Sequence, residues 1–165
     1  MTRIRTANGR HMKRSPLLSK SWRPALLLSG LAILFASLSH AETPPGRYTI
    51  TAGVVKDTKT GLEWQQTESG ATYTFAAAQT HCAGLGGTWR TPSVKELLTL
   101  VDESRSYPAV DTSVFTSIPE AGNLATCYQT STPLAGTPIT WLVCFDEGRP
   151  TYDSATDAYR ALCVR

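Results

Sequence analysis

The sequence predicts an α+β domain, and three observations support that prediction. Apolar residues alternate as in strands at both ends of residues 48–165, and two segments with helical periodicity follow each other between them. A long stretch, 102–138, has four prolines and little regular apolar pattern. Strands and helices grouped in this way, rather than alternating, are typical of the α+β class. Residues 48–165 contain all the cysteines of the chain, Cys82, Cys127, Cys144 and Cys163.

The first 41 residues are predicted to be an export signal and not part of the domain. Residues 1–23 hold seven basic groups and no acidic one, residues 25–38 are uncharged, and Ser39-His40-Ala41 suits signal cleavage. The uncharged run is shorter than the roughly 20 residues of a membrane-spanning helix. We therefore expect a signal peptide at 1–41, translation from Met1 or Met12, and a mature protein in the periplasm or outside the cell.

Export reverses the charge of the chain. The whole sequence has 16 Lys and Arg against 13 Asp and Glu, but residues 42–165 keep nine basic and 13 acidic groups, a net charge of −4. A basic surface is the main feature of proteins that bind nucleic acid. We therefore expect no nucleic-acid partner, and contact with a membrane only during export.

The cysteines are predicted to form two disulfides, because an even number in an exported chain is best explained that way. Their spacings of 45, 17 and 19 residues lack the close ligand pairs of a zinc site. His81 adjoins Cys82, and adjacent residues on a helix do not face each other, which disfavours a catalytic thiol. The sequence predicts no catalytic residue, metal or cofactor, and it leaves all three disulfide pairings open.

The domain is expected to open with a hairpin after a short linker, residues 42–47. Tyr48–Val55 alternates like a strand, with Gly53 as a candidate bulge. Asp57–Gly61 has the composition of a turn, and Leu62–Gln66 would return as the second strand.

The first predicted helix begins after Thr74, whose hydroxyl can cap it. Its apolar positions recur at steps of three and four and are Phe75, Ala78, Cys82 and Leu85. Gly84, Gly86 and Gly87 are expected to end it. Cys82 would then lie on the buried face, which suits a disulfide to a distant strand.

The second predicted helix begins with Ser93-Val94-Lys95-Glu96, which has the form of a capping box. Its apolar stripe consists of Val94, Leu97, Leu98 and Val101. Trp89 and Arg90 stand just before it, where they could form a ligand site or fix the helix to a core. The periodicity favours the core helix, with Arg90 paired to Glu96 or Asp111.

The remaining elements surround the long stretch 102–138, which must be functional or pinned in place. Ile139–Phe145 is predicted to be a strand, Asp146–Pro150 a turn and Ala161–Arg165 a last strand. The tryptophans of segments with a buried-face pattern are predicted to be core residues rather than sugar platforms. They are Trp64, Trp89 and Trp141.

Five motifs in order carry a resemblance to a known family. They are KDTKTGLEWQ at 56–65, TWRTPSVKEL at 88–97, YPAVDTSVF at 107–115, TWLVCFDEG at 140–148 and ALCVR at 161–165. They resemble the Lcl C-terminal domain family, a secreted bacterial domain of unknown function, over residues 48–165. The resemblance implies a C-type-lectin-like fold, related to that of formylglycine-generating enzymes, with two helices packed on small antiparallel sheets.

The resemblance also implies a disulfide pairing, carried over by position: Cys82–Cys163 and Cys127–Cys144. The chain departs from the family at Gln129, where a tryptophan is usual, and it lacks the calcium-binding motifs of lectins. One family member binds glycosaminoglycans, but a net charge of −4 does not carry that ligand over.

The function expected from these observations is a non-catalytic binding module for a glycan or a protein. The alternatives are a structural or assembly protein of the envelope and, least favoured, an enzyme. Loops and turns between rigid strands usually carry function. On that ground the expected ligand face consists of Tyr128, Asp146, Glu147, Arg149, Tyr152 and Asp153.

Overall fold

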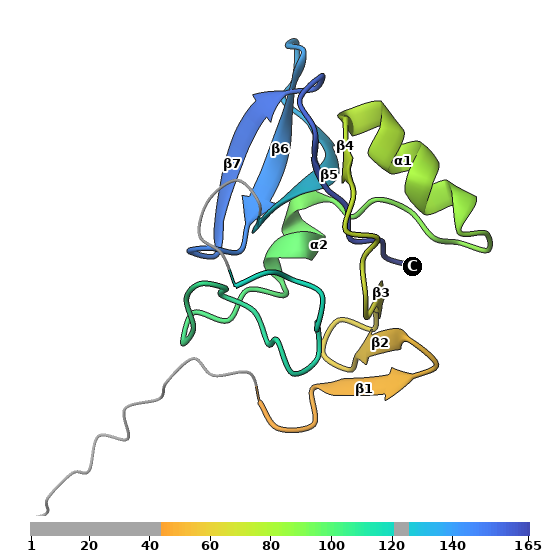
Figure 1. The fold of residues 1–165 in the computed structure, drawn as a ribbon, viewed down its shortest axis with the longest axis vertical. Coiled ribbons are helices and arrows are strands. Elements are labelled where there is room, and N and C mark those ends of the chain that lie inside the picture. The colour runs from red at the N-terminus through yellow and green to blue at the C-terminus, as the bar shows by residue number, and fades with distance from the viewer. Residues whose placement is uncertain (1–43, 121–125) are drawn as a thin grey trace, which may run out of the picture. The chain divides into compact units, whose positions relative to one another are not determined.

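A computed structural model describes residues 44–120 and 126–165 of the chain, so the predicted signal peptide lies outside the described residues. The described residues form one antiparallel sheet, one mostly antiparallel sheet and two helices (Figure 1). The predicted α+β class is therefore confirmed. Its two disulfides join Cys82 to Cys163 and Cys127 to Cys144, which is the pairing that the resemblance implies.

The first sheet has the order β1-β2-β3, with β1 at Tyr48–Thr51, β2 at Val54–Asp57 and β3 at Glu63–Gln65. The predicted single strand 48–55 is wrong, because the chain reverses at Ala52 and Gly53. Both residues have positive φ, 50° and 77°. Two successive left-handed residues make the turn that best matches the twist of a hairpin. Gly53 therefore belongs to a turn and not to a bulge.

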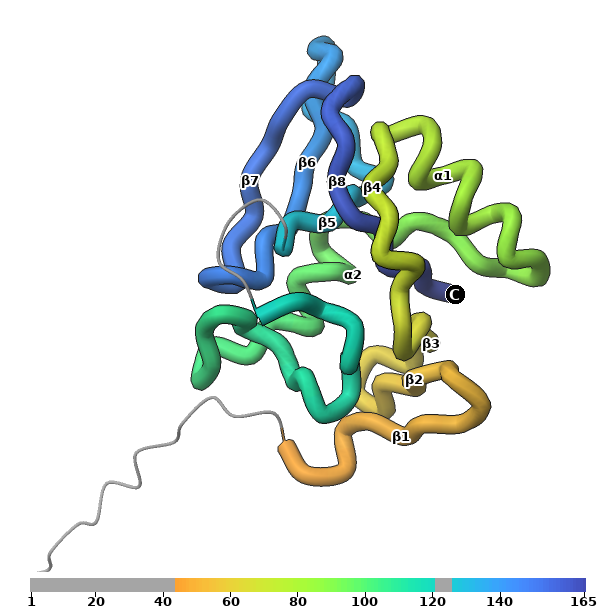
Figure 2. Tube along the Cα trace, in the orientation of Figure 1, coloured from red at the N-terminus to blue at the C-terminus, as the bar shows by residue number. Residues whose placement is uncertain are grey.

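The second sheet has the order β4-β8-β5-β6-β7, in which β5 and β8 run parallel and the other neighbours antiparallel (Figure 2). Its strands are β4 Thr72–Tyr73, β5 Cys127–Pro133, β6 Ile139–Cys144, β7 Arg149–Ser154 and β8 Tyr159–Arg160. The sequence predicted β6 alone among them. The predicted last strand 161–165 is replaced by β8 and by isolated bridges that Val164 makes with Trp64 and Arg90.

The helices are α1, Phe75–Gly84, and α2, Val94–Leu98, and both begin where the sequence predicts. The Thr74 hydroxyl accepts the Ala77 N–H at the start of α1. Leu85 was expected on the buried face of α1, but it lies beyond the helix and is 43% exposed. The helix ends one residue earlier than the apolar pattern suggests.

The stretch 102–138 is not a free loop, contrary to the irregular pattern of its sequence. Val110, Phe115 and Ile118 are buried in the main core, and β5 occupies its last part. Gln129 is buried on β5 and donates to the backbone carbonyls of Tyr73 and Asp157 at 3.0 and 3.1 Å.

The main core joins the first sheet, α2, the stretch after it and one face of the second sheet. Its fully buried members include Val55, Trp64, Leu97, Val110, Phe115, Tyr128, Val143, Phe145 and Val164. A smaller cluster covers the opposite face of the second sheet and contains Cys127, Leu142, Cys144 and Tyr159. The second sheet is therefore buried on both faces near its centre, while its outer strand β7 reaches solvent.

Candidate functional site

The residues expected at a ligand face fall into two groups in the structure. Tyr128 is fully buried, and its ring packs edge-on against Phe145 with centroids 5.4 Å apart. Burial raises the pKa of its hydroxyl well above the usual range. Tyr128 is therefore a core residue, and its assignment to a ligand surface is wrong. The other five residues lie on β7 and on the turn that joins it to β6.

The register of β7 divides these residues between two faces. Ala155 donates to the Pro138 carbonyl at 2.8 Å, in line with the pairing of β7 and β6. Because successive side chains of a strand point to opposite faces, Arg149 and Asp153 lie on one face and Tyr152 on the other. The expected ligand face is thus not a single surface.

Asp153 has a structural partner on its own face. It accepts a short hydrogen bond from the hydroxyl of Tyr159 and another from the Ser154 N–H. The first of these bonds contributes most to the lowered pKa of the Asp153 carboxyl. Burial and then this same bond raise the pKa of Tyr159 to about 12. Asp153 therefore serves to hold Tyr159 of the smaller core cluster.

The other face of β7 carries an exposed aromatic pair. Tyr152 is 58% exposed, and its ring meets that of half-buried Trp141 edge-on with centroids 5.7 Å apart. The two residues stand directly opposite each other on β6 and β7. Their position is a non-hydrogen-bonded one, where cross-strand side chains come closest. Trp141, expected in the core, instead supports a surface tyrosine.

A second exposed tyrosine lies at the tip of the same hairpin. Tyr107 is 51% exposed, its N–H donates to the Asp146 carbonyl at 2.8 Å, and its hydroxyl lies 3.4 Å from the Glu147 carboxylate. Glu147 also pairs with Arg149 at 3.0 Å, and both side chains are more than half exposed. Sequence reasoning missed Tyr107, because it lies in a stretch without periodicity and reaches the hairpin through tertiary contact alone.

The tip of the hairpin is packed tightly against the domain. A Cβ atom at Gly148 would lie 2.6 Å from Cγ1 of Val101 and 3.0 Å from Cβ of Ala109, and Gly148 has a positive φ of 68°. The Cys127–Cys144 disulfide joins β6 to β5 just before the tip. The aromatic pair and Tyr107 are therefore presented on a fixed scaffold.

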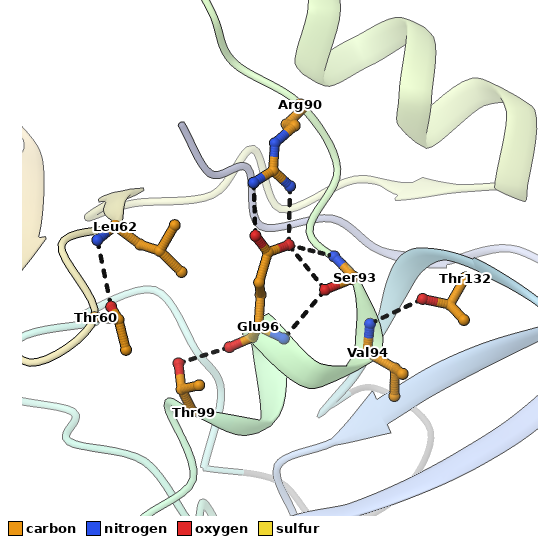
Figure 3. A network of polar contacts seen from close by, with 8 residues as sticks. All are labelled: Thr60, Leu62, Arg90, Ser93, Val94, Glu96, Thr99 and Thr132. Atoms are coloured by element: carbon orange, nitrogen blue, oxygen red, sulfur yellow. Dashed lines mark hydrogen bonds and ion pairs between the residues drawn. The ribbon is translucent and has the colours of Figure 1, made fainter.

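The Trp89-Arg90 motif forms a joint between α2 and the rest of the fold. Arg90 donates two hydrogen bonds to Glu96, at 2.9 and 2.6 Å, and Glu96 also accepts the Ser93 N–H at 2.8 Å (Figure 3). The pairing of Arg90 with Glu96 and the capping box are thus confirmed. Trp89 is half-buried, with the guanidinium of Arg165 4.7 Å from its ring centroid, so it is not the core residue that was expected.

Replacing Glu96 with Gln is expected to remove a pH-dependent part of the stability. The hydrogen bonds from Arg90, followed by those from Ser93, outweigh burial and lower the pKa of Glu96 from 4.5 to about 2. Its contribution is therefore present above pH 4.5 and is lost as the pH falls towards 2. We expect Glu96→Gln to cost about 1–2 kcal/mol at pH 7, since Arg90 is half exposed and solvent screens the pair.

Urea denaturation at pH 7 and at pH 3 would measure this difference. Lys95→Gln is the matched control, because it changes one charge on the same helical turn at an exposed position. An equal loss of stability for Glu96→Gln at both pH values would contradict the role assigned to the capping box.

Further features of the described residues bear on the chemistry that the domain can perform. Within residues 44–120 and 126–165, there is no group of three or more His, Cys, Asp or Glu side chains placed to hold a metal ion. In the same part of the chain no helix is long and apolar enough to cross a membrane. All four cysteines are consumed by the two disulfides.

The fold and this surface define a class: a small disulfide-bonded α+β domain that presents exposed aromatic side chains on a strand hairpin. Disulfide-stabilised domains of this kind are typical of exported proteins. The family model described as the Lcl C-terminal domain matches residues 53–165, and the chain belongs to this family. A search of curated proteins found no match. The C-type-lectin-like part of the expectation stays a prediction.

Proposed function

We propose that the domain is an exported, non-catalytic binding module that recognises a glycan or a protein. Its contact surface is the face of the β6–β7 hairpin that carries Tyr152 and Trp141, extended at the tip by Tyr107 and Glu147. The exposed pair of Tyr152 and Trp141 carries this proposal.

Exposed aromatic side chains on a fixed backbone favour binding for a physical reason. Tyr and Trp offer a large contact area and lose little rotamer freedom, and they are enriched at the energetic centres of interfaces. Tyr152 is mostly exposed, and Trp141 on the neighbouring strand contacts its ring edge-on. A partner would therefore meet a surface that is already in place and would pay little to order it.

Two observations support a module without catalysis. The formation of disulfides leaves no cysteine as a thiolate nucleophile. The carboxylates nearest the hairpin have structural partners, since Asp153 holds Tyr159 and Glu147 pairs with Arg149.

The experiment that tests the proposal is binding to an array of neutral and acidic oligosaccharides, run with and without a calcium chelator, beside a screen against envelope proteins. We expect saturable binding to one of these probes that the chelator leaves unchanged. A domain that binds none of them would favour the structural or assembly role instead.

Tyr152→Ala is expected to weaken binding to the selected probe by about tenfold or more, since central aromatic residues dominate the energetics of an interface. Its melting temperature should stay close to that of the wild type, because the ring is mostly exposed. Leu85→Ala is the matched control, an exposed apolar residue at the far end of α1. Calorimetric titration that finds wild-type affinity for Tyr152→Ala would exclude this surface.

A further inference from the structure

The two sheets end in four edge strands, and three of them are protected against pairing with another chain. An unprotected edge presents free N–H and C=O groups that template strand addition. At β3, Glu63 exchanges backbone hydrogen bonds of 2.9 and 2.8 Å with Arg165 of the C-terminal tail. At the far end of the second sheet, β4 has only two residues.

The β7 edge is blocked by its own side chains. The backbone groups of residues 149, 151 and 153 bond to β6, as the register and the hydrogen bond from Ala155 to Pro138 define. The backbone N–H and C=O groups of residues 150, 152 and 154 therefore point away from the sheet. Pro150 has no N–H to offer, and the Ser154 N–H donates to the Asp153 carboxylate at 2.8 Å. A continuous ladder with a further strand cannot form there.

The β1 edge has no comparable protection. Thr58 donates to the Arg47 carbonyl at 2.9 Å, and Thr51 opposes Val54 across the two-residue turn, so residues 47, 49 and 51 face β2. The backbones of Tyr48 and Ile50 consequently point outward. Within residues 44–120 and 126–165, no hydrogen bond from outside the sheet reaches either of them. In Figure 1, β1 lies at the margin of the domain.

The side chains of β1 also favour pairing. The segment Tyr48-Thr49-Ile50-Thr51 has no charge and no proline. All four residues are of the β-branched or aromatic types that are typical of strands. Ile50 is 45% exposed although it is a large apolar residue. An edge with these properties is the reverse of β7, where the same chain places Pro150 and a capping carboxylate.

We propose that β1 is a self-association surface, which pairs antiparallel with β1 of a second copy of this chain. A two-fold axis at Thr49 places Tyr48 of each copy opposite Ile50 of the other. In this register the outward N–H and C=O groups of both residues are used at once, with four hydrogen bonds in all. The two three-stranded sheets become one sheet of six strands.

A second copy fits this edge better than an unrelated strand because the edge is complementary to itself. Ile50, 45% exposed in the single chain, would be covered by Tyr48 of the second copy. On the other face the two Thr49 side chains meet at the axis, and Lys56 stands one strand further out in each copy. No like charges oppose each other directly. The contact is short, so the dimer is expected to depend on concentration.

Cysteine cross-linking tests both the dimer and its register. All four native cysteines are paired, so an introduced cysteine is the one free thiol of the chain. In the proposed register two Thr49 residues form a non-hydrogen-bonded pair with Cα atoms about 4.5 Å apart, within the range of a disulfide. Mild oxidation of Thr49→Cys should yield a covalent dimer on a non-reducing gel.

Thr51→Cys is the matched control, since the two copies of residue 51 would be about 13 Å apart, four residues out of register. It should give at least tenfold less covalent dimer. Adding Ile50→Pro to Thr49→Cys should reduce the cross-link similarly, because it removes an outward N–H and leaves the bonds to β2 intact. Circular dichroism would establish that this variant is folded.

Sedimentation of the purified wild-type protein completes the test. A dimer fraction that rises with concentration and falls in Ile50→Pro is the expected result. Equal cross-linking of Thr49→Cys and Thr51→Cys, a monomer at every concentration, or pairing only with unrelated extended peptides would overturn the proposal. Ligand binding by the β6–β7 hairpin lies in the other sheet, so Ile50→Pro should leave it unchanged.

Discussion

Replacing both Cys82 and Cys163 with alanine is expected to lower the free energy of unfolding by about 4–5 kcal/mol. The bond closes a loop with a sequence separation of 81 residues, and its removal restores the chain entropy of that loop to the unfolded state. It also ties α1 to the C-terminal tail, which in turn pairs with β3 and with Arg90. A loss of this size is comparable to the whole stability of many small domains.

The double replacement of Cys127 and Cys144 provides the comparison. Its sequence separation is 17 residues, so the same entropy argument gives a loss of about 3 kcal/mol. Urea denaturation of the two double variants should therefore rank them in this order, with a gap of roughly 1–2 kcal/mol. The opposite ranking would mean that local packing around β5 and β6, and not loop closure, determines the contribution of these bonds.

The helices could be predicted from sequence because their signals are local. The capping residues Thr74 and Ser93 and the step of three or four between apolar residues act within a few positions. Glu96 reaches back to Ser93 in the structure as the motif predicts. The turn at Asp57–Gly61 was predictable for the same reason, with Gly61 at a positive φ of 78°.

The parts that escaped prediction depend on contacts between residues that lie far apart in sequence. Phe115 has no apolar periodicity around it, yet it is fully buried against Tyr48 with ring centroids 5.6 Å apart. In the β1–β2 turn Ala52 adopts the left-handed conformation. Because glycine is the usual residue in that conformation, alanine at this position does not predict a turn. β7 is largely exposed and contains Pro150, so neither alternation nor composition indicates a strand.

The candidate site shows the same division. The sequence pointed to the 146–153 segment as a ligand face, which stays a prediction, but it could not tell which of these side chains share a face of β7. Tyr128 stands beside polar residues in sequence, and only the position of β5 between β6 and β8 makes it a core residue. Tyr107 and Trp141 join the surface through tertiary and cross-strand contacts that no local pattern encodes.

Arg47 lies in the segment that the sequence assigns to a linker, yet it forms a buried ion pair with Asp57. Its guanidinium is 7% exposed and donates to the fully buried Asp57 carboxylate at 3.1 and 2.6 Å, and to the Thr99 carbonyl at 2.6 Å. The pair therefore joins the first sheet to the end of α2. Asp57→Asn is expected to cost about 3–5 kcal/mol, because it leaves a buried cation without its anion.

The ion pair makes the free energy of unfolding depend on pH in the acid range. Burial opposes the ionisation of Asp57, but hydrogen bonds from Arg47 and the Lys59 N–H outweigh it and hold the pKa of its carboxyl below the usual range. The contribution is therefore complete above the unfolded value of about 3.9 and is lost as the pH falls through the folded value. Asp57→Asn should abolish this part of the acid dependence while keeping an acceptor for Lys59.

Glu147→Gln serves as the control, since it removes a charge from an exposed pair with Arg149 and is expected to cost about 0–1 kcal/mol. A third variant separates the pair from its parts: Arg47→Met with Asp57→Leu removes both charges at once. Because the penalty of Asp57→Asn comes from an unpaired charge, the double variant should recover much of the lost stability. Urea denaturation that finds it less stable than Asp57→Asn would show that the ion pair itself, and not the avoidance of a lone buried cation, stabilises this part of the domain.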